Sequence, residues 1–67
     1  MKERLVVFWY RGHLAYCTEN EYKNRMDYMY CILPNYRDFD EVKDYLVSVC
    51  NYDNYIVDMT EAEDDAN

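Results

Sequence analysis

Glycine and proline are almost absent from this chain of 67 residues, which contains one of each. Phosphate-binding loops need several glycines so that the backbone can approach the phosphate closely, and Gly12 alone cannot supply them. We therefore expect no nucleotide hydrolysis. The scarcity of these breakers, together with 51% hydrophobic residues, also excludes a disordered or low-complexity chain. The length predicts one small domain.

Long apolar runs and paired cysteine motifs are absent as well. The apolar run 5–10 (LVVFWY) is too short to cross a membrane or to form the core of a signal peptide. The three cysteines are an odd number and include no CxxC pair, so we expect reduced thiols rather than a disulfide framework. These features predict an intracellular, cytoplasmic protein.

The sequence contains no arrangement of residues that is typical of catalysis or metal binding. The four possible zinc ligands, His13, Cys17, Cys31 and Cys50, have spacings that match no common zinc module. Ser48 is the only serine, and it lies far along the chain from His13, so no catalytic triad is indicated. We expect no enzyme activity, metal or cofactor. A small zinc-binding module remains an alternative that metal analysis would test.

Bases are missing from the last third of the chain. Residues 1–43 carry seven acids and seven bases, whereas residues 44–67 carry seven acids and no base, so the net charge of −7 lies entirely in the second segment. Such an excess repels phosphate backbones and anionic membrane surfaces. We therefore expect no direct binding of nucleic acid or membrane, and we expect a basic protein as the partner.

The first part of the chain predicts a β-hairpin. Residues 5–10 are β-branched and aromatic almost throughout, which is typical of a strand buried on both faces. Arg11 and Gly12 then form a two-residue turn, because glycine readily adopts the positive φ that this turn needs, and residues 13–18 return as the second strand.

The segment 19–33 allows two interpretations. In the first, residues 19–25 form a polar loop and residues 26–33 form a strand that ends before Pro34. In the second, Thr18 and Glu21 form a capping box that starts a helix. Helical spacing supports the second interpretation at Tyr22, Met26, Met29 and Leu33. We prefer the strand.

The remaining elements complete an α+β domain. Asp38 is a typical N-cap, and an apolar stripe from Phe39 to Val49 predicts a helix over residues 39–50, followed by a strand over residues 55–60. The predicted fold is a small antiparallel sheet of order β-β-β-α-β with one helix packed on one face, which leaves the other face uncovered. Residues 1–60 form the domain, and residues 61–67 (EAEDDAN) form an acidic flexible tail.

Nine tyrosines are more than so small a core can bury, and tyrosine is favoured at interfaces because it offers a large contact area and a hydroxyl group. Acids lie beside several of them in the second half of the chain. Together they predict a partner-binding surface that consists of Asp40, Glu41, Asp44, Tyr52, Asp53, Tyr55, Asp58, Glu61 and Glu63. The alternative interpretation is that these acids form a solvated helix face and a solubilising tail.

A very short, acidic, tyrosine-rich chain with no catalytic constellation resembles the small virus-encoded proteins that bind and disable a host enzyme. Phage counter-defence proteins such as anti-CRISPRs and nucleic-acid mimics are examples. The resemblance rests on the acids and tyrosines between Asp38 and Asp65, and it is one of character and not of motif, so it assigns no role to single residues. It implies a cytoplasmic inhibitor that occupies a basic, nucleic-acid-binding surface of its target.

A second hypothesis comes from a different class of protein. The chain could be a structural or adaptor subunit that associates through the apolar sheet face, as a homodimer for example. Salt distinguishes the two, because an electrostatic contact weakens as salt is added and an apolar contact does not.

Overall fold

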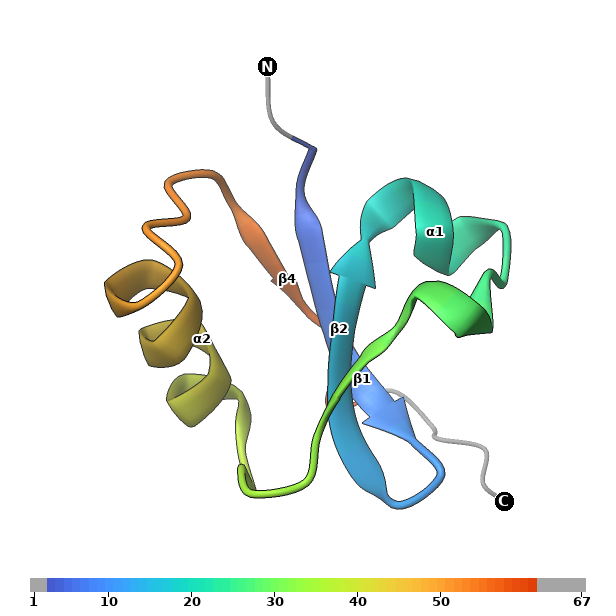
Figure 1. The fold of residues 1–67 in the computed structure, drawn as a ribbon, viewed down its shortest axis with the longest axis horizontal. Coiled ribbons are helices and arrows are strands. Elements are labelled where there is room, and N and C mark those ends of the chain that lie inside the picture. Colours follow the sequence, from blue (N-terminus) through green and yellow to red (C-terminus); the bar gives the residue numbers. More distant parts are fainter. Residues whose placement is uncertain (1–2, 62–67) are drawn as a thin grey trace.

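The computed structural model describes residues 3–61, which form a small α+β domain with one main helix (Figure 1). The elements follow in the order β1 (Leu5–Tyr10), β2 (His13–Thr18), α1 (Glu19–Lys23), the 3-10 helix η1 (Asp27–Met29), β3 (Cys31–Leu33), α2 (Phe39–Ser48) and β4 (Ile56–Asp58). The predicted fold class is confirmed. None of the helices in residues 3–61 has the length and apolar character that a membrane crossing needs.

The hairpin of β1 and β2 forms as predicted. Its strands pair antiparallel along their whole length, from Leu5 opposite Thr18 to Tyr10 opposite His13. The two turn residues both have positive φ, 54° at Arg11 and 85° at Gly12. Two consecutive positive φ values give the turn a twist that matches that of the strands, which explains why glycine is needed here.

The sheet has the strand order β3-β2-β1-β4, and it is mixed rather than antiparallel. β3 pairs antiparallel with β2, but β4 pairs parallel with β1, with Val7 opposite Asp58. The reason is the helical connection. β3 runs in the same direction as β1, α2 runs back across the sheet, and β4 then repeats the direction of β3 on the far edge.

Apolar side chains fill two cores, one on each face of the sheet. The core under α2 contains Val7, Leu14, Val42, Leu46 and Ile56, all buried. Successive side chains of β1 point to opposite faces, which explains why its apolar residues are continuous and not alternating.

The second core lies under α1 and η1, so the prediction of an uncovered sheet face is wrong. Val6, Phe8, Ala15 and Cys17 are buried there. The ring of Phe8 lies 4.9 Å from that of Tyr22 and 4.8 Å from that of Tyr30, measured between centroids. These two tyrosines close the face that no long helix covers.

The segment 19–33 combines the two interpretations. The capping box forms, because the Glu21 N–H donates to Thr18 Oγ1 at 3.2 Å and the Thr18 N–H donates to Glu21 Oε1 at 3.0 Å. The expected loop over residues 19–25 is therefore mostly α1, and the expected strand over residues 26–33 shortens to β3. Pro34 ends the strand, as predicted.

The later boundaries are also shorter than expected. α2 starts at Phe39 as predicted and ends at Ser48, two residues early, and β4 keeps only Ile56–Asp58 of the expected strand. Of the expected acidic tail, only Glu61 is described; residues 62–67 lie outside the described part of the chain.

Candidate interaction surface

Acidic side chains follow the solvent face of α2. The helix starts at Asp38, whose Oδ1 accepts a hydrogen bond from the Glu41 N–H at 3.0 Å. Glu41 itself accepts from the Arg37 N–H at 2.6 Å, so part of its hydrogen-bonding capacity stabilises the start of the helix. The Asp40 side chain is exposed and has no hydrogen bond or ion pair to the residues that the structure describes. Asp44 is exposed one turn further along, where it accepts from Ser48 Oγ at 3.5 Å.

A groove of about 310 Å³ separates α2 from β4. The helix contributes Phe39, Lys43 and Val47, which stand on one face because they are spaced by four residues. The other wall consists of residues at and before β4: Asn54, Tyr55, Ile56 and Asp58. The groove is partly apolar, because Val47 is 47% exposed and Tyr55 is 64% exposed.

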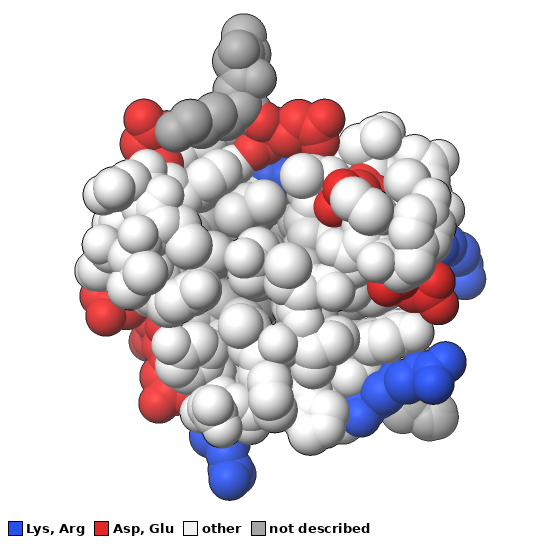
Figure 2. Space-filling model, in the orientation of Figure 1, with Lys and Arg blue, Asp and Glu red and all other residues white. Residues whose placement is uncertain are grey.

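The β4 wall of this groove contains a carboxylate, that of Asp58. Asp58 Oδ1 accepts from the Thr60 N–H at 2.9 Å and from Thr60 Oγ1 at 2.6 Å, which orients the carboxylate at the end of the strand. Asp53 and Glu61 are exposed on either side of β4. Figure 2 shows further acidic atoms bordering the α2 side of the molecule, at its left. Among the groove residues that the structure describes, Lys43 is the one base.

Of the nine predicted surface residues, two line this groove. Tyr55 and Asp58 line it, and the acids of α2 lie on the helix that forms its other wall. Tyr52 does not belong to an exposed surface, because its ring packs on the α2 core and its hydroxyl donates to the Glu3 carbonyl. Glu63 lies outside the described residues.

Sequence reasoning missed Asn54 and Ile56 in the β4 wall of the groove, and it also missed three residues in the α2 wall, Phe39, Lys43 and Val47. Their spacing of four residues was the available signal, since it places them on one helix face. The predicted apolar stripe consisted of Phe39, Val42, Leu46 and Val49, and it included neither Lys43 nor Val47; only Val42 and Leu46 are buried in α2.

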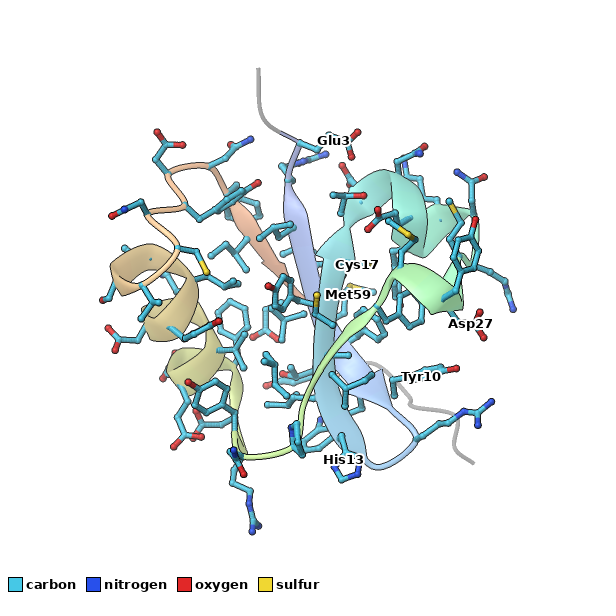
Figure 3. All side chains as sticks on the ribbon, viewed as in Figure 1. Glu3, Tyr10, His13, Cys17, Asp27 and Met59 are labelled. Carbon is cyan, nitrogen blue, oxygen red and sulfur yellow. The ribbon has the colours of Figure 1, made fainter. Side chains whose placement is uncertain are left out.

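The three cysteines differ in their burial. Burial raises the pKa of the Cys17 thiol to about 12, so this thiol stays protonated at neutral pH. Figure 3 shows Cys17 in the interior. Cys31 and Cys50 are exposed. No group of three or more His, Cys, Asp or Glu side chains within residues 3–61 is arranged to hold a metal ion.

No family model, no curated protein and no solved structure matches this chain. The chemistry of the surface is therefore the basis on which a function can be assigned. That chemistry is a groove with exposed apolar side chains, lined by Lys43 and Asp58, next to a helix that carries Asp40, Glu41 and Asp44.

Proposed function

We propose that this protein is a non-enzymatic inhibitor that binds a basic, nucleic-acid-binding surface of another protein and so competes with nucleic acid. The observation that carries the proposal is the position of the exposed carboxylates. Asp58 lines the groove together with the exposed Val47 and Tyr55, and Asp40 and Asp44 are exposed on α2, the helix that forms the other wall.

This combination suits a basic protein surface. Carboxylates pair with Arg and Lys through charge-assisted hydrogen bonds, as phosphates do. The aromatic ring of Tyr55 adds contact area that does not depend on charge. A surface with both features binds more tightly than exposed ion pairs alone, because isolated surface pairs contribute little.

The same charges argue against nucleic acid as the direct ligand. The α2 and β4 side carries one base, Lys43, against a majority of acids. A protein gains affinity for nucleic acid by neutralising phosphates with Lys and Arg, and this surface would add repulsion.

Competition with nucleic acid tests the proposal. The protein is immobilised and exposed to a heparin-eluted fraction of cell lysate, which is enriched in nucleic-acid-binding proteins. We expect it to retain basic proteins at low salt and to release them when salt or duplex DNA is added, because both compete for the same charges. Retention that neither salt nor nucleic acid reduces would contradict the proposal.

A matched pair of variants locates the contact. The double variant D40N/D44N removes two charges from α2 and should lose most of the retained protein. The control E19Q/D27N removes two charges from α1 and η1, which cover the sheet face opposite to α2 (Figure 1). Asp27 accepts from the Tyr10 hydroxyl at 3.2 Å, and an asparagine oxygen can still accept there. Equal loss in the two variants would mean that only net charge matters.

A second candidate, a subunit that associates with its own kind, is favoured by another surface. The face on which β3 lies, turned toward the viewer in Figure 2, carries few charged side chains. Ile32 on β3 and Tyr28 and Met29 on η1 are exposed apolar side chains, with Tyr28 76% exposed. Uncharged, partly apolar faces of this kind are typical of homodimer contacts.

Light scattering over a range of protein concentrations separates the two candidates. A homodimer through β3 should be dissociated by the charged variant I32K and not by V49K, because Val49 is exposed at the end of α2. A monomer at all concentrations leaves the inhibitor as the proposal.

A further inference from the structure

The outer edge of β4 has backbone groups that face away from the sheet. β4 is an edge strand that pairs only with β1 in the described sheet. The Met59 N–H donates to the Val7 carbonyl at 2.9 Å, and backbone groups alternate in direction along a strand. Ile56 and Asp58 therefore direct their N–H and C=O groups outward, where an added strand would receive them.

The groove beside this edge lies where the side chains of an added strand would go. Side chains of neighbouring strands stand side by side on the same face of a sheet. Ile56 and Asp58 point to the α2 face and line the groove together with Val47. A strand placed next to β4 would direct every second side chain between β4 and α2.

We propose that an extended segment of the basic partner binds by adding a fifth strand to the sheet at β4. This inference rests on the proposed function and specifies how the partner is recognised. Main-chain hydrogen bonds to Ile56 and Asp58 would supply affinity that is independent of sequence, as in other cases of strand addition. The groove and its carboxylates would supply specificity.

The groove defines the sequence of the segment in outline. Val47 and Tyr55 favour an aliphatic side chain between α2 and β4. Lys43 disfavours a second cation at that position because like charges repel. Lys or Arg residues fit at the ends of the segment, near Asp53 and Asp58, which are exposed before and at the end of β4.

The opposite edge of the sheet is less suitable for a basic segment. β3 has the sequence CIL, with no charged residue, and Pro34 follows directly. A proline on an edge is a common way of protecting it against added strands. The acids that would attract a basic segment lie by β4 instead.

Alternating lysine–valine peptides test strand addition directly. One form is unmodified, a second is N-methylated at every valine, and a third at every lysine. All three peptides keep the same charge. In a strand, the N–H groups of the valines point to one side and those of the lysines to the other. One N-methylated peptide therefore loses its hydrogen bonds to β4, and the other keeps them. We expect the two N-methylated forms to differ in affinity by at least about tenfold.

Amide shifts and two groove variants complete the experiment. The unmodified peptide should shift the amide signals of Ile56 and Asp58 in a nuclear magnetic resonance titration. The variant V47W fills the groove and should weaken binding by about tenfold or more. The variant V49W should not weaken binding, because Val49 is exposed at the end of α2 outside the groove.

The outcomes separate strand addition from the proposed function. If all three peptides bind equally, or none binds, while basic proteins are still retained through Asp40 and Asp44, strand addition is wrong and the inhibitor stands. If D40N/D44N retains basic proteins as well as the unchanged protein, the proposed function fails, and the inference fails with it.

Discussion

The backbone N–H of Met59 donates to the carbonyl of Val7 at 2.9 Å. This hydrogen bond joins the last strand in sequence to the first and continues the parallel pairing of β4 beyond Asp58. It also determines which residues of β4 bond to the sheet and which face outward. The edge beside the groove owes its open hydrogen-bonding groups to this register.

Amide hydrogen exchange should reproduce that alternation. The Met59 amide, which is bonded to Val7, should exchange slowly, and the amides of Ile56 and Asp58 should exchange faster because they point away from β1 and have no acceptor in the described sheet. Exchange rates measured by nuclear magnetic resonance check this. Slow exchange at Asp58 with fast exchange at Met59 would mean that the register differs by one residue and that the groove side chains lie on the other face.

Two neighbouring residues of α2 should differ sharply in their effect on stability. Leu46 is 1% exposed in the α2 core, whereas Val47 is 47% exposed at the groove. We expect L46A to reduce the free energy of unfolding by about 2–5 kcal/mol. V47A should change it by less than about 0.5 kcal/mol. Urea denaturation measures both, and similar losses would mean that the helix faces are assigned wrongly.

Local sequence signals were sufficient to predict the hairpin and α2. Gly12 marks the turn, and the continuous apolar run before it fits a strand that is buried on both faces. Asp38 marks the start of α2, and the apolar spacing defines the buried side of the helix. In each case the deciding residues are close together in the sequence.

Contacts between distant segments decided what the sequence could not. The rings of Tyr22 and Tyr30 pack on Phe8, so α1 and η1 take the place of a longer strand and cover the second face. The parallel pairing of β4 depends on how α2 crosses the sheet. The groove requires the relative position of Val47 and Tyr55, which no spacing along the chain reveals.

Removing the capping box should weaken the domain measurably. The variant T18A deletes the hydroxyl that accepts from the Glu21 N–H and should cost about 1 kcal/mol of unfolding free energy. S48A is the control, because the Ser48 hydroxyl lies 3.5 Å from Asp44 and contributes little. Urea midpoints compare the two. A loss for S48A as large as that for T18A would contradict the importance of the cap.

The three thiols should react in two classes. Cys31 and Cys50 are exposed and should react with a disulfide reagent in the native state, whereas buried Cys17 should react only after unfolding. Quantifying the reacted thiols with and without denaturant checks this. Rapid reaction of all three in the native protein would contradict the packing of the core under α1.

The burial of Cys17 should also make the protein less stable at alkaline pH. Burial raises the pKa of Cys17 from an ordinary value of 9.0 to about 12 in the folded state. Between these values the unfolded thiol loses its proton while the folded thiol keeps it, which favours unfolding. Burial also raises the pKa values of Tyr16 and Tyr30, with the same sign. Urea denaturation below pH 9 and between pH 9 and 12 measures the free energy of unfolding. Its decline with pH should be smaller in the variant C17A than in the unchanged protein.

Lys43 provides a test in which binding should improve. It is the base among the groove residues, and it repels the cations of a basic partner. The variant K43Q removes this charge, keeps a side chain of similar reach, and should raise the affinity for a retained basic protein by a few-fold at low salt, since exposed charge interactions contribute up to about 1 kcal/mol. The gain should vanish at high salt because screening removes it.

The control K23Q removes a charge from α1, on the other face of the sheet, and should have a smaller effect. Equal gains from the two variants would show that net charge alone controls binding and that the groove between α2 and β4 is not the contact.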